Sequence, residues 1–188
     1  MAKERVMAMK RNTSELTNVS LGMGTHIEFE RIGIYEHLSP RYQFEYVPTP
    51  LSAGGVGMYV NSELHYKVLE KTTNEAFQAL WIEIQCENKK NIICGVFYRQ
   101  HNSPGRFQNY FDESLERFGS LNKPVYILGD FNINLLRIET CSYAHNFLLT
   151  MQSYGFSPTI DKPTRVHKDS ATLIDNILIN KTNGSVQS

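Results

Sequence analysis

The stretch Pro124–Asn132 near the middle of the chain constrains the fold more than any other part of the sequence. Its first part, Val125–Leu128, is an unbroken run of β-branched, aromatic and aliphatic residues, which predicts a buried strand. Gly129, Asp130 and Asn132 follow at once. Such a strand end is either a tight turn, because these residue types are common in turns, or a sheet edge that carries functional side chains. The rest of the chain decides between the two interpretations.

Apolar patterning elsewhere predicts sheet structure covered by helices. Residues 80–85 alternate with a period of two, and Asn91–Tyr98 is nearly all apolar after a short polar link, so these strands are expected to pair antiparallel. Shorter strands are expected at Ile32–Ile34, Tyr42–Tyr46 and Val56–Val60. Apolar residues recur at helical spacing in two stretches: Phe107, Tyr110, Phe111, Leu115 and Phe118, and then Ala144, Phe147, Leu148 and Met151. We therefore favour a mixed α/β sandwich of the α+β type over parallel βαβ winding.

Three segments fit this pattern less simply. Residues 1–28 are mostly polar and lack a regular period, so we expect them to be poorly ordered or weakly helical. Residues 161–169 are polar and by themselves predict a solvated loop. The last apolar strand, Ala171–Ile179, is interrupted at Asp175, and a carboxylate in the middle of a strand is costly unless it is paired or lies at a strand end. Asp175 is therefore a second candidate functional residue.

Composition excludes some classes of function. Lys plus Arg and Asp plus Glu both number 19 in 188 residues, so net charge provides no general attraction to nucleic acid or to an acidic membrane. Phosphate binding would need a local cluster of side chains. The three cysteines lack the spacing of a zinc site, and Cys94 lies in an apolar strand, which indicates a reduced, intracellular protein, nuclear or cytoplasmic. Neither a membrane span nor a signal peptide is predicted.

Polar residues end or interrupt three of the predicted strands, and their chemical types suit phosphoryl transfer. They are Tyr98 and Arg99, then Asp130 and Asn132, then Asp175, with Arg165 in a nearby loop. A carboxylate can orient or deprotonate a water molecule, an amide can donate to a phosphorane oxygen, and a tyrosine or arginine can hold the phosphate. A divalent metal can neutralise charge on the leaving oxygen.

The stretch Gly129–Asn132 resembles the GDxN motif of the endonuclease/exonuclease/phosphatase superfamily. More closely, the chain is similar to the apurinic-type endonuclease domain of non-LTR (LINE-type) retrotransposons, over roughly residues 42–181. The resemblance depends on motifs in the family's order: Ala53–Val60, Ala79–Ile84, Gly95–Arg99, Gly129–Leu136, Pro163–Val166 and Ser170–Asp175.

The resemblance implies a two-sheet sandwich flanked by helices, and Mg²⁺- or Mn²⁺-dependent hydrolysis of DNA that leaves a 3′-hydroxyl. It implies that Asp130 activates the attacking water, that Asn132 stabilises the pentacovalent phosphate, and that Tyr98 lies at the phosphate. Asp175 would orient a catalytic histidine, by analogy with the acid of a Ser-His-Asp triad. Arg99 and Arg165 are predicted to contact the substrate.

The chain also departs from the family. The family's Ser-Asp-His motif has no copy after Asp175, and the last histidine is His167. Glu36 is the candidate metal ligand, and 1–28 is a divergent segment before a partial domain at 29–188. We therefore expect impaired activity. The alternatives are an inactive fragment or binding module of the same fold, or a phosphoesterase acting on another substrate. The expected partners are DNA and a reverse transcriptase region of a parent polyprotein.

Overall fold

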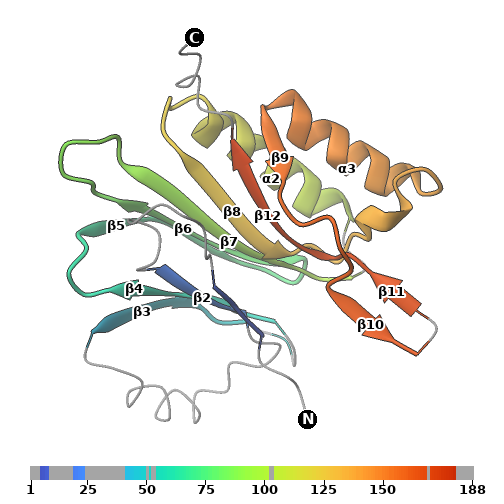
Figure 1. Ribbon diagram of the computed structural model, residues 1–188, viewed down its shortest axis with the longest axis horizontal. Helices are drawn as coiled ribbons and strands as arrows, with labels where there is room; N and C mark the ends of the chain where they lie inside the picture. The colour runs from blue at the N-terminus through green and yellow to red at the C-terminus, as the bar shows by residue number, and fades with distance from the viewer. Residues whose placement is uncertain are drawn as a thin grey trace.

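The computed structural model describes residues 5–8, 19–23, 41–49, 51, 54–101, 104–168 and 170–180. Two sheets contain most of these residues (Figure 1). The first sheet has the order β1 (Arg5–Ala8), β2 (Val19–Met23), β4 (Val56–Asn61), β3 (Tyr42–Val47), and all of its neighbouring strands are antiparallel. The second has the order β5 (Tyr66–Thr73), β6 (Phe77–Ile84), β7 (Ile92–Arg99), β8 (Val125–Asp130), β12 (Asp175–Asn180), β9 (Phe156–Pro158).

The directions of the strands in the six-stranded sheet decide which strand ends lie side by side. Strands β7 and β8 run parallel and are joined by helix α2 (Pro104–Gly119), whereas the other strand pairs described in this sheet are antiparallel. A short 3₁₀ helix, η3 (Leu135–Arg137), and helix α3 (Ser142–Ser153) follow β8. Strands β10 (Arg165–His167) and β11 (Ser170–Thr172) form a separate two-stranded ribbon that projects from the molecule (Figure 1).

The six-stranded sheet is the middle of three layers, with both helices on one face and the four-stranded sheet on the other (Figure 1). Successive residues of its central strands project from opposite faces of the sheet. On β7, Ile93 and Phe97 pack in the helix-side core, while Cys94 and Val96 pack against the four-stranded sheet. Burial on both faces explains why these strands appear in the sequence as nearly continuous apolar runs.

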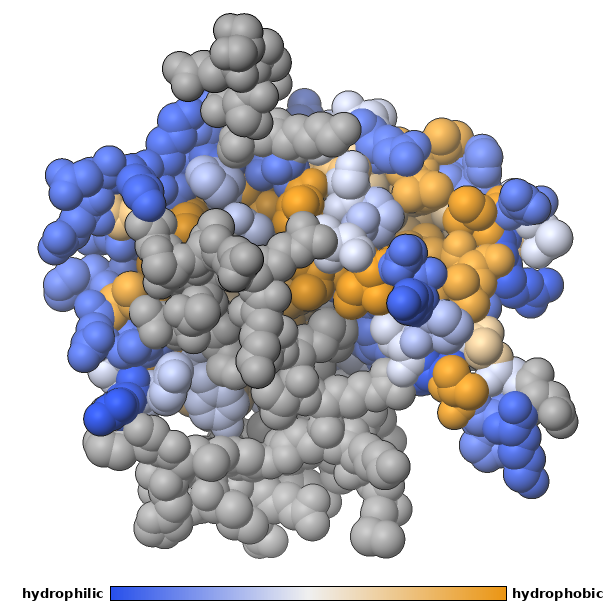
Figure 2. Space-filling view, viewed as in Figure 1, coloured by the Kyte–Doolittle hydropathy of each residue, from blue (hydrophilic) through white to orange (hydrophobic). Residues whose placement is uncertain are grey.

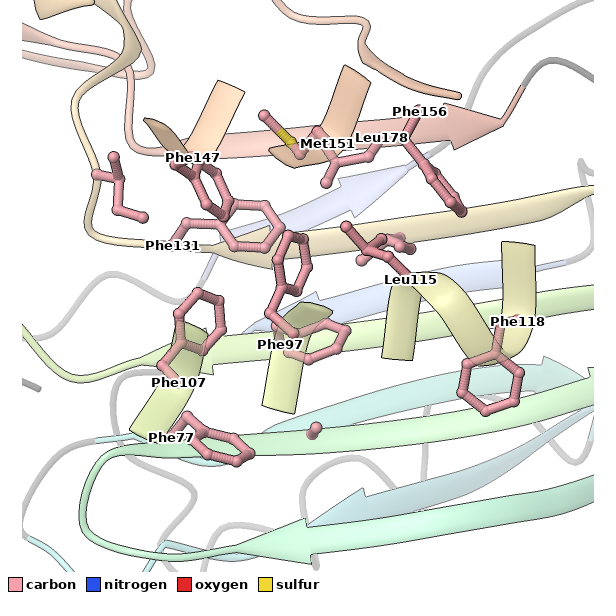
Figure 3. Close-up of a cluster of buried hydrophobic side chains, with 14 of the residues drawn as sticks. Phe77, Phe97, Phe107, Leu115, Phe118, Phe131, Phe147, Met151, Phe156 and Leu178 are labelled. Atoms are coloured by element: carbon pink, nitrogen blue, oxygen red, sulfur yellow. The ribbon is translucent and has the colours of Figure 1, made fainter. Parts of the chain in front are cut away.

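Phenylalanine dominates the core between the sheet and the helices (Figure 3). Phe97 of β7 packs edge-to-face on Phe111 of α2, with ring centroids 5.6 Å apart. Phe131, just past β8, lies against Phe147 of α3 at 5.3 Å. The apolar stripes predicted for the two helices thus form this core, and the residues after β8 are anchored in it.

The expected mixed sandwich is confirmed, with several local differences. Strand β8 continues through Asp130, and the apolar run 171–179 is divided into β11 and β12, so that Asp175 begins a strand and does not interrupt one. Residues 165–167 form β10 and not loop, and β5 was not anticipated.

In the N-terminal segment, Arg5–Ala8 and Val19–Met23 are strands, in place of the expected poorly ordered or weakly helical structure. The expected strand at Ile32–Ile34 lies outside the described residues. None of the helices in the described ranges is long and apolar enough to span a bilayer.

Surface hydropathy varies across the face shown in Figure 2. Apolar side chains gather on the side of α3, where Leu149 of that helix is 49% exposed. The β10–β11 ribbon is mostly hydrophilic but carries Val166, which is 74% exposed. The ribbon therefore presents an apolar side chain next to charged ones.

Candidate active site

A polar row crosses four neighbouring strands of the six-stranded sheet at one end. Gln78 of β6 lies opposite Tyr98 of β7, Tyr98 opposite Asp130 of β8, and Asp130 opposite Asp175 of β12. Residues paired in this way project from the same face, and adjacent strands are about 4.8 Å apart. Leu128, two residues before Asp130, packs against the four-stranded sheet, so the row lies on that face.

Asp130, in the middle of the row, is 5% exposed and both of its carboxylate oxygens accept hydrogen bonds. Its Oδ1 accepts a hydrogen bond from the backbone N–H of Asn132 at 3.1 Å, the arrangement of an Asx turn. Its Oδ2 accepts from Nη2 of Arg165, which also forms an ion pair with it. The Asx turn therefore forms at the same residues as the candidate site, so the two interpretations of this strand end do not exclude each other.

Asn132 has a left-handed backbone with φ of 50°, which asparagine adopts more readily than most residues. Its Nδ2 donates to the backbone oxygen of Arg99 at 2.6 Å. The side-chain amide is thereby held beside the end of β7, next to Tyr98. Asn132 thus combines an unusual backbone conformation with a fixed side chain, as expected of a functional group in a strand-end loop.

Tyr98 is half-buried beside the catalytic candidates. Burial raises the pKa of its phenol above the usual range, and the negative charge of Asp130 acts in the same direction, while Arg165 and a hydrogen bond with Asn132 act against it. The phenol is therefore protonated at neutral pH and can donate a hydrogen bond. A Cβ on Gly54 would lie 3.1 Å from the Tyr98 ring and 2.7 Å from Oε1 of Gln78, so only glycine fits at that position.

Arg165 reaches Asp130 from the β10–β11 ribbon, and its side chain remains 41% exposed. The base of the ribbon is joined to the start of β12, because Oγ1 of Thr164 accepts from the backbone N–H groups of Ile174 and Asp175 at 3.4 and 3.3 Å. The Thr164 N–H also donates to the Thr172 oxygen at 2.9 Å. Asp175 is 1% exposed. Hydrogen bonds of Thr164 thus connect the β10–β11 ribbon to the strand that carries Asp175.

Arg99 lies elsewhere than predicted. It was expected to contact substrate, but it is 3% exposed and projects from the opposite face to Tyr98, toward the helices. Its Nη1 donates to the backbone oxygens of Phe131 and Asn132 at 3.2 and 3.3 Å. This position does not support direct substrate contact. Arg99 instead holds the loop that carries Asn132.

The donor set suits a hard divalent cation. Asp130, Asn132 and Asp175 offer carboxylate and amide oxygens, and Mg²⁺ takes oxygen ligands and retains several waters. Within the described ranges, no three His, Cys, Asp or Glu side chains come together. Glu36, the predicted metal ligand, lies outside the described residues.

Two residues next to the candidate site, Gln78 and Thr164, were not singled out from the sequence. Gln78 is fully buried; its Oε1 accepts from the Gly55 N–H at 3.2 Å and its Nε2 donates to the Asn74 oxygen at 2.8 Å. Extending the alternation of residues 80–85 backwards would have placed it on the buried face. Thr164 has no comparable signal, because its role depends on the position of β12.

Comparison with known proteins gives the same fold. The family model described as "Endonuclease/Exonuclease/phosphatase family" matches residues 12–187. No curated protein sequence matches the chain. Among solved structures, the endonuclease domain of TRAS1, a telomere-specific non-LTR retrotransposon, aligns with a TM-score of 0.58 and 12% identity, covering 77% of this chain and 69% of that one.

Two further solved structures align to a similar degree. The catalytic domain of human nocturnin gives a TM-score of 0.57 at 14% identity, over 79% of this chain and 63% of its own. ANGEL2, described as a 2′,3′-cyclic phosphatase, gives 0.59 at 13% identity, over 87% and 69%. At these identities the likeness establishes the fold alone, whereas the family match extends over nearly the whole sequence. The chain therefore belongs to the endonuclease/exonuclease/phosphatase family.

Proposed function

We propose that the protein is a divalent-metal-dependent endonuclease that hydrolyses phosphodiester bonds in DNA. The observation that carries the proposal is the alignment of Tyr98, Asp130 and Asp175 across three adjacent strands, with Asn132 and Arg165 converging on Asp130. The DNA substrate is supported by the order of the sequence motifs and by the fold shared with a retrotransposon endonuclease.

Each residue has a role that its surroundings favour. Asp130 orients a water molecule and accepts its proton as the water oxygen bonds to phosphorus. Asn132 and the protonated Tyr98 donate hydrogen bonds to the non-bridging oxygens, and Arg165 adds positive charge at the phosphate. The bond from phosphorus to O3′ breaks, and its electron pair stays on O3′. That oxygen takes a proton from solvent, so the products are a 3′-hydroxyl and a 5′-phosphate.

A bound Mg²⁺ or Mn²⁺ would neutralise charge that develops on the leaving oxygen. Asp130, Asn132 and Asp175 would hold it, together with Glu36 if that residue acts as predicted.

The test is nicking of supercoiled plasmid in the presence of Mg²⁺ by the parent, by Asp130→Asn and by Asp112→Asn. Asp130→Asn keeps the shape of the side chain but removes the base, so we expect a loss of about 100-fold or more. Asp112 accepts a hydrogen bond from Gln108 and belongs to α2, which covers the face of the sheet opposite the polar row, so Asp112→Asn should nick like the parent. Equal nicking by Asp130→Asn and the parent would refute the assignment.

A phosphoesterase acting on another substrate is the second candidate, because ANGEL2 and nocturnin share the fold to the same degree. Asp130-dependent turnover of a nucleoside 2′,3′-cyclic phosphate without plasmid nicking would favour it. A binding module of the same fold would retain DNA without cutting it. A gel-shift assay beside the nicking assay separates that outcome from the other two.

A further inference from the structure

Arg99 occupies a buried niche behind the proposed site. It ends β7, and its guanidinium carbon lies 5.7 Å from the ring centre of Phe107 in α2 and 5.1 Å from that of Tyr143 in α3. A guanidinium is weakly hydrated and stacks on aromatic faces, so it tolerates such a niche better than an ammonium does. Arg99 therefore contacts the first turns of both helices as well as the loop after β8.

The hydrogen bonds of Arg99 converge on the two residues after Asp130. Nη1 donates to the backbone oxygens of Phe131 and Asn132, and the backbone oxygen of Arg99 accepts from Nδ2 of Asn132. Buried carbonyl groups need donors, and among the hydrogen bonds described for this loop Arg99 provides them. Both the backbone and the side chain of Asn132 are thus tied to one residue.

This attachment decides where Asn132 points. A left-handed backbone is one of several conformations open to asparagine in a loop, and a fixed donor for its carbonyl selects that conformation. The same residue's N–H donates to Oδ1 of Asp130, so its position also sets the orientation of the carboxylate. A small shift of the loop would move both groups together.

We propose that Arg99 is a positioning residue that acts through Asn132 and, through the Asn132 N–H, on Asp130. The proposal rests on the proposed function, because it assigns Asn132 and Asp130 to the chemistry. It replaces the substrate contact predicted for Arg99 from the sequence. It also explains why an arginine is buried at the end of a strand whose neighbouring residue, Tyr98, belongs to the polar row.

The test is a kinetic comparison of Arg99→Met, Arg99→Lys and Arg117→Met with the parent, using single- and multiple-turnover nicking of a DNA duplex. Methionine fills the niche without donors, so we expect kcat to fall about 100-fold, the loss typical of a misplaced catalytic group. KM should change less than about twofold, because no substrate contact is lost. Lysine keeps one donor and should recover part of the loss.

Arg117→Met is the matched control. Arg117 also stacks on a phenylalanine, Phe118 at 4.3 Å, and donates to Glu70, but it lies ten residues beyond Phe107 on α2, about 15 Å along the helix. It should lose stability without losing kcat. A rise in KM at unchanged kcat in Arg99→Met would overturn the proposal, since that result indicates a substrate contact.

A double-mutant cycle with Asn132→Ala tests the path of the effect. Asn132→Ala removes the side-chain amide but keeps the backbone N–H that bonds to Asp130, so only part of the effect of Arg99 remains. Arg99→Met should therefore cost less than about tenfold in the Asn132→Ala background, because coupled residues are not additive. Losses that multiply in full would overturn the proposal. If Arg99→Met does not fold, the same double-mutant cycle is measured with Arg99→Lys and Asn132→Ala.

An NMR measurement separates failure of this inference from failure of the proposed function. The Asn132 side-chain amide, bonded to the Arg99 oxygen, should exchange with water at least about tenfold faster in Arg99→Met and at the parent rate in Arg117→Met. This readout needs no activity. If the parent shows no Asp130-dependent cleavage, the endonuclease proposal fails while faster exchange still supports the positioning of Asn132. Unchanged exchange in Arg99→Met overturns the inference regardless of activity.

Discussion

Gly95→Ala should destabilise the protein because a tryptophan occupies the space that a side chain would need. Gly95 lies in the middle of β7, directly opposite Trp81 of β6. An added Cβ would lie 2.6, 2.7 and 2.9 Å from three indole carbons, whereas ordinary contacts begin near 3.4 Å. Trp81 is fully buried and packs on Phe118 at 4.2 Å and Phe97 at 5.4 Å, so the indole has little room to retreat.

The expected cost follows from two opposing effects. Overpacking a core costs about 1–3 kcal/mol, and the tightly held indole favours the upper end. Replacing glycine by alanine restores about 0.4–1 kcal/mol by restricting the unfolded chain. The net loss is about 2 kcal/mol, a large part of the roughly 5–15 kcal/mol that stabilises a typical domain. It corresponds to a fall in Tm of about 4–8 °C for a chain of this size.

Urea denaturation measures this loss directly. Trp81 is the single tryptophan, so its fluorescence reports on this contact in the parent and in Gly95→Ala, and far-ultraviolet circular dichroism serves for variants that lack it. In a Trp81→Leu background, Gly95→Ala should cost less than about 0.5 kcal/mol, which gives a coupling energy of about 1.5 kcal/mol. The reasoning would be refuted if the free-energy costs of Gly95→Ala and Trp81→Leu added to within about 0.5 kcal/mol in the double variant. It would also be refuted if Gly95→Ala alone were as stable as the parent.

Three further predictions test burial and charge elsewhere. Burial raises the pKa of the Cys94 thiol to about 12, so no more than two of the three thiols should react with a disulfide reagent at pH 8 until urea is added; equal rates for all three would contradict this. Burial acts to raise the pKa of Glu70, but hydrogen bonds from Tyr110 and Arg117 outweigh it and lower that pKa. The Glu70 carboxylate therefore stabilises the fold above its unfolded pKa and loses this effect as pH falls through the folded value. Between pH 5 and 3 the Tm of Glu70→Gln should therefore fall less than the Tm of the parent. Parallel plots of Tm against pH for the two proteins would contradict this prediction. Val166→Ser on the exposed ribbon should change the free energy of unfolding by less than about 0.5 kcal/mol, measured in urea.

The sequence predicted those elements whose burial leaves a strong pattern. The central strands β6, β7 and β8 are covered on both faces, and helix α2 buries one face, so their residues follow clear apolar runs or stripes. Strand β5 lies at the edge of the sheet and mixes Lys, Glu and Thr with apolar residues, which leaves no such signal. Strand β10 is three residues long and mostly exposed, and its pairing with β11 depends on local geometry that composition does not record.

The residue types of the candidate site can be named from the sequence, but their arrangement in space cannot. Asp130 and Asp175 face each other only because β12 pairs antiparallel with β8, and 44 residues lie between them in the chain. The placement of Arg99 on the helix side has a simpler cause. Neighbouring residues of a strand project from opposite faces, so Tyr98 and Arg99 cannot both line the same rim. This alternation applies to Arg99 only if the strand continues through that residue, as β7 does. The exact end of a secondary-structure element is the part that a sequence predicts least well.

The location of the site follows from the parallel pairing of β7 and β8. A strand that returns parallel through a helix places two carboxyl ends side by side, and β12 adds its own first residue at the same edge. One face of that edge carries the row of Tyr98, Asp130 and Asp175, and the other carries Arg99 against the helices. Substitutions on the row face should therefore change the chemistry itself, while those on the helix face should change how well the row is aligned. Tyr98 and Arg99 are neighbours in the sequence but project from opposite faces, so substitutions at the two positions should have different kinetic effects and not only effects of different magnitude.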